Sequence, residues 1–227
     1  MLVQVKELLS KEAVNQCRNL LSQAQWADGK ITAGTQSEQV KNNQQLPEKT
    51  PQLPELRKII MENLQRNGLF FSACLPRRTF PPLFNRYSGT TNSFGDHVDN
   101  AIRTFAPTGE SIRTDVSCTI FLSEPDEYEG GELVIQDSYG AQKVKLPAGD
   151  AILYPATSLH RVEPVTKGER VASFLWVESM VRDNEHRRIL FDMDMAIINL
   201  RQSIGENSPV VTLTSCYHNL LRQWSET

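Results

Sequence analysis

Three residues with metal-binding side chains stand out in this sequence: His97, Asp99 and His160. If the segment around His97 is extended, its side chains alternate in direction, so His97 and Asp99 point the same way and could hold one ion. Two imidazoles and one carboxylate occupy one face of an octahedral metal and leave three positions open, which is typical of non-haem Fe(II) oxygenases. The alternatives are a surface hydrogen bond for the pair and a backbone-bonded imidazole for His160.

Arg170 follows His160 by ten positions, in a run from Arg170 to Val177 that is apolar on both faces. An inward-pointing Arg there would be a buried charge, which costs several kcal/mol unless an anion pairs with it. Guanidinium binds a carboxylate in a planar fork, so Arg170 could anchor an acidic cosubstrate whose other end chelates the metal. The alternatives are a salt bridge to Glu169, Glu178 or another internal acid, or a place at the solvated start of the strand.

The candidate metal ligands and Arg170 lie in a region of short apolar or alternating runs separated by turns that contain Gly and Pro. This pattern favours an antiparallel sandwich or barrel, whose strands would position the four side chains. No long helical pattern interrupts these runs, which argues against a parallel α/β sheet. The expected strands are Leu83 to Ser88, the stretch around His97, Asp115 to Ser123, Glu132 to Asp137, Gln142 to Leu146, Asp150 to Pro155, Leu159 to Val165 and Arg170 to Glu178.

Helical periodicity marks both ends of the chain and predicts a mainly β protein with helical ends, of the α+β class. Helices are expected at Ser10 to Gln25, Leu53 to Asn67 with Gly68 as a stop, Ile189 to Ile204, and Ser208 to Trp224. Trp26 to Gln52 is expected to be a loop, either with short strands or, as the default, as a solvated connector. The expected regions are an N-terminal helical and loop region at 1–77, a catalytic β domain at 78–179 and a C-terminal helical extension at 180–227. The apolar face of Ile189 to Ile204 could serve a homo-oligomer as easily as the domain's own core.

Composition narrows the classes of partner. The 24 basic and 27 acidic residues give a net charge of −3, which is too balanced to indicate binding to nucleic acid or to an anionic membrane. The four cysteines form no C-x-x-C pair, which favours reduced thiols. The N-terminus shows no signal peptide pattern, and no apolar window reaches membrane-spanning length. We therefore expect a cytoplasmic protein without a membrane partner.

The set of His97, Asp99, His160 and Arg170 resembles the iron- and 2-oxoglutarate-dependent dioxygenases of the prolyl 4-hydroxylase type. The resemblance is closer still to the bacterial PKHD-type hydroxylases and runs nearly end to end. It includes the stretches Val40 to Gln45, Pro82 to Tyr87, Gly130 to Leu133, Leu146 to Asp150 and the carboxy-terminal helices. In the collagen-type animal enzymes a Lys replaces the Arg, so Arg170 agrees with the bacterial branch.

This resemblance implies a double-stranded β-helix, or jelly roll, in which His97, Asp99 and His160 bind Fe(II) and Arg170 binds the distal carboxylate of 2-oxoglutarate. It implies hydroxylation of an unactivated C–H bond with dioxygen, release of succinate and carbon dioxide, and L-ascorbate as a reductant. Tyr87 resembles a family Tyr that hydrogen-bonds the cosubstrate, although an aromatic packed on the sheet is the alternative. Phe94 stands where many relatives carry a second Tyr, so no hydroxyl role transfers to it.

Two other functions stay open at this point: a non-catalytic cupin-like sensor of iron or 2-oxoglutarate, and a purely structural sandwich. The substrate is a prolyl or lysyl residue or a small molecule. The loops Tyr87 to Phe94 and Ala101 to Arg113 flank the expected metal and are candidates for substrate selection. The apolar Val116, Ile120 and Leu153 are candidates to keep the pocket dry, although ordinary core packing explains them equally.

Overall fold

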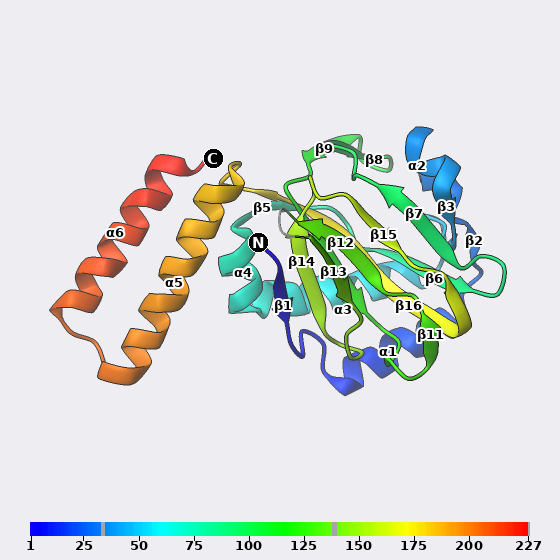
Figure 1. Cartoon of the computed structure of the whole chain (residues 1–227), viewed down its shortest axis with the longest axis horizontal. Helices are drawn as coiled ribbons and strands as arrows, with labels where there is room; N and C mark the ends of the chain where they lie inside the picture. The colour runs from blue at the N-terminus through cyan, green and yellow to red at the C-terminus, as the bar shows by residue number, and fades with distance from the viewer. Residues whose placement is uncertain (33–34, 138–139, 227) are drawn as a thin grey trace.

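Two antiparallel β-sheets packed face to face form the centre of the computed structural model, which describes residues 1–32, 35–137 and 140–226 (Figure 1). The larger sheet has the strand order β1-β14-β10-β16-β6-β4-β2, and β5 and β11 also pair with β16. Its strands are β1 (Val3–Val5), β2 (Ala27–Asp28), β4 (Gln44–Gln45), β5 (Pro76–Thr79), β6 (Leu83–Ser88), β10 (Val116–Phe121), β11 (Tyr128–Gly130), β14 (Ala151–Pro155) and β16 (Val165–Ser179).

The smaller sheet has the strand order β13-β12-β15-β7-β3. Its strands are β3 (Lys41–Asn42), β7 (Ser93–His97), β12 (Leu133–Asp137), β13 (Gly140–Val144) and β15 (His160–Val162). A separate hairpin of β8 (Ile102–Phe105) and β9 (Glu110–Arg113) lies beside the sheets. Together with the structural neighbours described below, this arrangement confirms the predicted double-stranded β-helix.

Strand β10 shows how alternation in the sequence separates a core face from a pocket face. Val116, Cys118 and Ile120 belong to the apolar cluster that the large sheet shares with the N-terminal helices. Ser117 and Thr119, between them, line the pocket between the two sheets. One strand therefore contributes both to the core and to the wall of a polar site.

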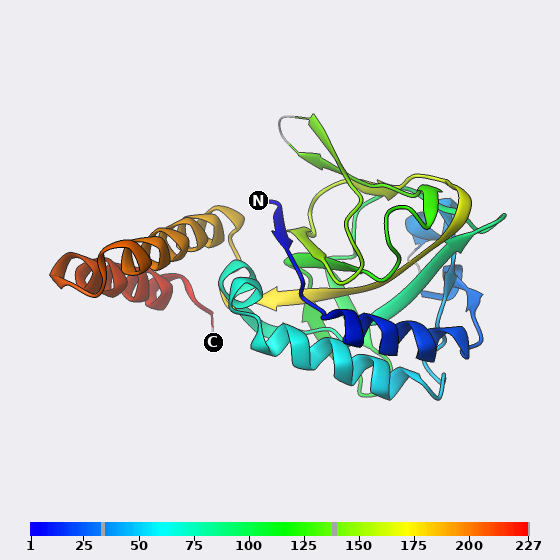
Figure 2. The ribbon, with the colours of Figure 1, turned by 90° about the horizontal axis from the view of Figure 1, so that it is seen from below.

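Three helices cover the outer face of the larger sheet: α1 (Lys11–Ser22), α3 (Leu53–Arg66) and α4 (Gly68–Cys74). Figure 2 shows α1 and α3 running side by side along that face. The α1 helix begins where the Ser10 side chain accepts a hydrogen bond from the Ala13 N–H, and it buries Cys17 and Leu21 against the sheet. The outer face of the sheet is thereby removed from water.

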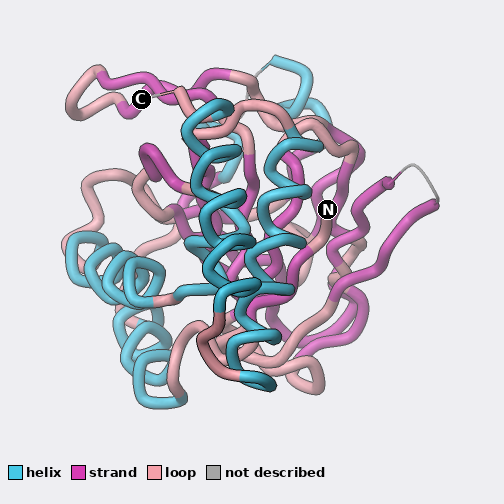
Figure 3. The backbone as a smooth tube through the Cα atoms, turned by 90° about the vertical axis from the view of Figure 1, so that its left-hand side faces the viewer, coloured by secondary structure: helices cyan, strands magenta, loops and turns pink. Residues whose placement is uncertain are grey.

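At the C-terminus, α5 (Asn184–Ile204) and α6 (Ser208–Trp224) form an antiparallel hairpin beside the β-sheets (Figure 3). The Asp183 carboxylate caps α5 by accepting from the N–H groups of Glu185 and His186, and Gly205 ends the helix. Leu190, on α5, belongs to an apolar cluster shared with α6. Within the described part of the chain, no helix is both long and apolar enough to cross a membrane.

The structure differs from the expected elements mainly in the N-terminal third. The expected helix Leu53 to Asn67 ends at Arg66, next to the predicted stop, but the Asn67 side chain accepts from the Phe70 N–H and an unexpected second helix, α4, starts at Gly68. The stretch Trp26 to Gln52 is not a solvated connector: it holds η1 (Gly29–Thr32), α2 (Thr35–Val40) and strands β2 to β4. Its Lys41 and Asn43 are buried. Strands β3 and β4 form through pairing with β7 and β6, which lie far along the chain and leave no local periodicity to read.

Candidate active site

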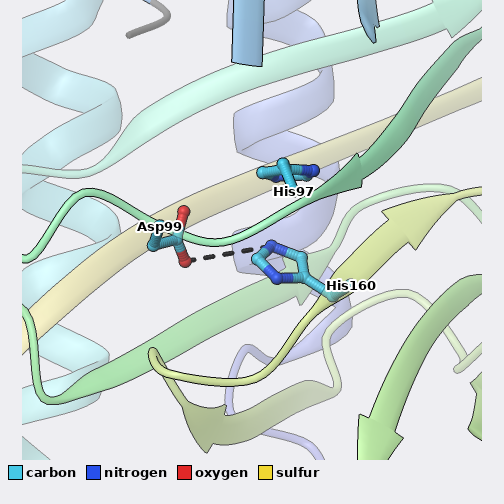
Figure 4. Close-up of side chains that lie close together, drawn as sticks. All are labelled: His97, Asp99 and His160. Atoms are coloured by element: carbon cyan, nitrogen blue, oxygen red, sulfur yellow. Dashed lines mark ion pairs between the residues drawn. The ribbon is translucent and has the colours of Figure 1, made fainter. Parts of the chain in front are cut away.

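His97, Asp99 and His160 converge at one end of the neighbouring strands β7 and β15 of the smaller sheet (Figure 4). His97 ends β7 and His160 begins β15, and these two residues are direct partners in the antiparallel register. One potential ligand atom from each of the three residues lies within 4.8 Å of the others. The His160 Nε2 atom lies 3.8 Å from the Asp99 Oδ2 atom. The two imidazoles and the carboxylate could therefore hold one metal ion, and this donor set suits Fe(II).

Each imidazole is held by a backbone carbonyl two residues before it. His97 Nδ1 lies 2.8 Å from the Gly95 carbonyl oxygen, and His160 Nδ1 lies 3.0 Å from the Ser158 carbonyl oxygen. With Nδ1–H donating, the Nε2 lone pair of each ring is free for a metal. Burial, followed by the charge of His160, lowers the pKa of His97 to about 4. His97 is consequently neutral near pH 7, the form that binds a metal.

Neighbouring side chains fix the orientation of this cluster. The Ser117 hydroxyl, from β10 of the opposite sheet, donates to Asp99 Oδ2 at 2.6 Å. The Phe94 ring stacks on the His97 imidazole with centroids 3.6 Å apart. Tyr154 meets His160 edge-on at 5.2 Å. Both sheets therefore contribute to holding the three ligand side chains in place.

Arg170 lies in the same pocket as an almost completely buried cation, with 1% of its surface exposed. Its Nε and Nη2 atoms have no hydrogen-bond partner among the described residues. The alternatives raised from the sequence do not hold, because Glu169 pairs with Arg86 and Glu178 pairs with Arg77 and Arg78. A buried guanidinium in this state is expected to receive an anionic ligand.

The surroundings of Arg170 are shaped to admit such a ligand. Tyr87 is its direct partner across the β6–β16 pairing, and the guanidinium carbon lies 5.3 Å from the Tyr87 ring centre. Gly131 has φ +70°, and a Cβ placed there would come within 3.1 Å of Arg170 Cδ and within 2.9 Å of Tyr128 Cε2. Only glycine leaves room for both side chains in this backbone conformation.

Arg170 and the three ligand residues line one pocket between the sheets, with two distinct ends. Arg170 and Trp176 both line the pocket and are six residues apart on β16. An extended strand therefore separates them by about 20 Å. We call Tyr87, Leu133 and Arg170 the inner end. We call Lys41, Arg103 and Trp176 the peripheral end.

Several lining residues were missed by reasoning from the sequence. Ser117 had a signal, since it is a polar residue within an otherwise apolar strand. No sequence signal marked Lys41, in the supposed connector, or Arg103, on the β8–β9 hairpin. Charged residues in polar segments usually face water. The expected water-excluding residues Val116, Ile120 and Leu153 lie instead in the core cluster beneath the helices. The apolar side chains that line the pocket include Leu133, Val162, Phe174 and Trp176.

Comparison with known proteins identifies the family of this chain. Residues 82–178 match the sequence model of the 2OG-Fe(II) oxygenase superfamily, and residues 184–226 match that of the PKHD-type hydroxylase C-terminal domain. A PKHD-type hydroxylase of Polaromonas sp. is 56% identical over 227 residues, and one of Saccharophagus degradans is 58% identical over 227 residues. Both alignments cover 100% of each chain. The chain belongs to the PKHD-type hydroxylases.

As a PKHD-type hydroxylase, the protein is an Fe(II)- and 2-oxoglutarate-dependent dioxygenase that hydroxylates its substrate. This sets aside the non-catalytic sensor and the purely structural sandwich.

Solved structures share its fold at low identity. A Trichoplax adhaerens prolyl hydroxylase, in complex with a hypoxia inducible factor peptide fragment, aligns with a TM-score of 0.55 at 14% identity, covering 83% of this chain and 86% of that one. HygX of Streptomyces hygroscopicus, with nickel and 2-oxoglutarate bound, aligns with a TM-score of 0.54 at 12% identity, covering 78% and 82%.

Proposed function

We propose that His97, Asp99 and His160 bind the Fe(II) of this hydroxylase and that Arg170 binds the distal carboxylate of 2-oxoglutarate. The observation that carries this proposal is the shared pocket: three mutually close ligand side chains and a buried guanidinium without an anion line one space. We assign Tyr87, directly opposite Arg170, a supporting contact to the cosubstrate.

When bound, Fe(II), 2-oxoglutarate and dioxygen supply the oxidising power that converts C–H to C–OH, and 2-oxoglutarate leaves as succinate and carbon dioxide. The protein's part is placement and exclusion of water. The Gly95 and Ser158 carbonyls orient the two imidazoles, and Ser117 orients the carboxylate. At the inner end, the guanidinium of Arg170 is already held in place, so little reorganisation of the protein is needed when the cosubstrate binds.

The substrate, the reductant and the location are separate proposals. We propose that the substrate is a prolyl or lysyl residue or a small molecule, with the Ala101 to Arg113 segment as one of its contacts. We propose L-ascorbate as the reductant from the family resemblance. A cytoplasmic location is proposed because Cys17, Cys74, Cys118 and Cys216 are all free thiols.

Anaerobic titration of 2-oxoglutarate into the Fe(II)-loaded protein tests the proposal. We expect a metal-to-ligand charge-transfer band to develop with one equivalent of cosubstrate, and succinate to form slowly once dioxygen and ascorbate are added. His97→Ala should show no band, whereas His218→Ala, on the distant α6 helix, should behave as the parent does. A parent protein that binds iron but develops no band would rule out chelation of 2-oxoglutarate at this centre.

A further inference from the structure

Two carboxamide side chains, those of Asn43 and Asn85, line the pocket beside its inner end. Asn43 is 1% exposed and Asn85 is 8% exposed. The Asn43 Nδ2 and Oδ1 atoms and the Asn85 Oδ1 atom make no hydrogen bond of normal geometry within the described part of the chain. Because a buried polar group without a partner is costly, these amides are expected to serve a ligand or a neighbouring group of the site.

The strand register places both amides next to the Tyr87 hydroxyl. Asn85 is two residues before Tyr87 on β6, so the two side chains point to the same face of the sheet, and Asn85 Nδ2 donates to the Tyr87 hydroxyl oxygen at 3.5 Å. The antiparallel pairing of β4 with β6, continued by one residue, places Asn43 beside Tyr87. Tyr87 pairs with Arg170 on its other side. Arg170, Tyr87 and Asn43 therefore form one row across neighbouring strands.

Gly29 holds Asn43 in this row. The Gly29 N–H donates to the Asn43 carbonyl oxygen at 2.9 Å, and a Cβ placed at Gly29 would collide with Asn43 Oδ1. Only glycine permits this close approach. The segment that links β3 to β4 thus carries a buried amide into the pocket wall, although its sequence is that of a polar loop.

The Tyr87 hydroxyl is a hydrogen-bond donor at neutral pH. Burial raises the pKa of Tyr87, and the charge of Arg170 and the side chain of Asn43 only oppose that rise, so the hydroxyl keeps its proton. A hydroxyl donates one hydrogen bond and accepts up to two. With the Asn85 amide donating to its oxygen and the Asn43 amide next to it, the proton of Tyr87 is left for a further group.

We propose that Asn43 and Asn85 are positioning residues, which orient the Tyr87 hydroxyl so that it donates to the 2-oxoglutarate carboxylate held by Arg170. Each amide occupies the accepting side of the hydroxyl oxygen, which disfavours rotation of the O–H bond away from the ligand. A donor that is already oriented needs less reorganisation when an anion binds. This inference rests on the proposed function, in which Arg170 and Tyr87 contact the cosubstrate.

A double-mutant cycle on the affinity for 2-oxoglutarate, measured by calorimetry on Mn(II)-loaded protein, tests the inference. Tyr87→Phe should weaken binding by about tenfold, because a hydrogen bond to a charged group is lost. Asn43→Ala should weaken it by about fivefold in the parent protein but by less than about twofold in the Tyr87→Phe protein, where no hydroxyl remains to be oriented. Asn42→Ala is the matched control: this exposed amide donates to the Thr90 carbonyl, and its removal should leave binding unchanged.

Asn85→Ala repeats the cycle with the second amide, so the test does not depend on the folding of one variant. Equal losses of affinity with and without the Tyr87 hydroxyl would overturn the inference, because the amides would then act on the fold or on the ligand itself. Unchanged affinity in Tyr87→Phe, or in both asparagine variants, would overturn it as well. Failure of the parent protein to bind Mn(II) and 2-oxoglutarate would contradict the proposed function, whereas normal loading with additive effects would contradict only this inference.

Discussion

The inner and peripheral ends of the pocket each hold a guanidinium, yet they are built differently. Arg170 lies on β16, a strand paired on both sides, and is buried between the rings of Tyr87 and Phe121. Arg103 lies on a two-stranded hairpin and remains partly exposed. The inner end is part of the sheet scaffold, whereas the peripheral end brings an edge strand and a hairpin to Trp176 at the far end of the same central strand.

This difference separates what the family chemistry requires from what an individual enzyme can vary. A cosubstrate common to all turnovers is best held by a rigid strand, since that placement keeps its reacting atoms near the metal. Hairpins and edge strands can change without disturbing the sheets, and they are the usual position of groups that select a substrate. The ligand cluster lies between the two ends and serves both.

The largest effect is expected from removing a proposed metal ligand. His97→Ala should lower the affinity for Fe(II) by more than about 100-fold and abolish succinate formation, because one of three protein ligands is lost. Anaerobic iron binding measured beside His186→Ala, a histidine that stacks on Trp224 far from the pocket, provides the control. Stoichiometric iron in the His97→Ala protein would show that the metal binds elsewhere.

The two arginines should differ in their effect on stability when no ligand is bound. Arg170→Met removes a buried charge without an anion and should raise the free energy of unfolding of the ligand-free protein by about 1 kcal/mol or more. Arg103→Met, at a partly exposed position, should change it by less than about 0.5 kcal/mol.

Urea denaturation of both variants, with and without iron and 2-oxoglutarate, measures these effects. Addition of 2-oxoglutarate to the iron-loaded proteins should further stabilise the Arg103→Met protein and leave the Arg170→Met protein nearly unaffected. Strong destabilisation by Arg170→Met without ligand would mean that the guanidinium has a partner inside the protein.

A smaller effect is expected from Ser117, which links the ligand cluster to the opposite sheet. Ser117→Ala removes the hydrogen bond to Asp99 and should weaken Fe(II) binding by about tenfold, as loss of outer-shell partners does in other metal sites. Ser173→Ala removes a buried hydroxyl of the same kind that bonds the Leu83 carbonyl instead, and should leave iron binding unchanged. Equal losses in the two variants would indicate general destabilisation of the sheet.

Gly131 tests the space around the inner end. Gly131→Ala should cost about 1–3 kcal/mol of stability and weaken 2-oxoglutarate binding, because the new Cβ would crowd Arg170 in a left-handed backbone conformation. Gly109 has a similar φ of +74°, but a Cβ placed there would have no atom within 4 Å. The Gly109→Ala variant therefore measures the loss of stability caused by backbone strain alone. Thermal unfolding measures the loss of stability in both variants, and titration measures the affinity for 2-oxoglutarate, which should fall in the Gly131→Ala protein alone. Normal 2-oxoglutarate binding in that protein would mean that Arg170 tolerates displacement.

The sequence indicated the ligand cluster and, at the inner end, Arg170 and Tyr87, but little of the peripheral end. His97, Asp99 and Arg170 stand out because metal-binding or charged side chains interrupt strand patterns that alternation makes readable. Lys41 and Arg103 lie in polar segments, where a charged residue normally faces water. Their burial depends on the pairing of β3 with β7 and on the placement of the β8–β9 hairpin over Trp176. Both are long-range contacts that leave no local signal.

The affinity for 2-oxoglutarate in Arg170→Gln and Arg103→Gln, measured side by side on Mn(II)-loaded protein, tests the division of the pocket most directly. We expect the dissociation constant to rise by about 30-fold or more in Arg170→Gln, as for other buried charge pairs that lose one partner, and by less than about twofold in Arg103→Gln. A larger loss in Arg103→Gln than in Arg170→Gln would contradict the account, because the cosubstrate would then lie at the peripheral end.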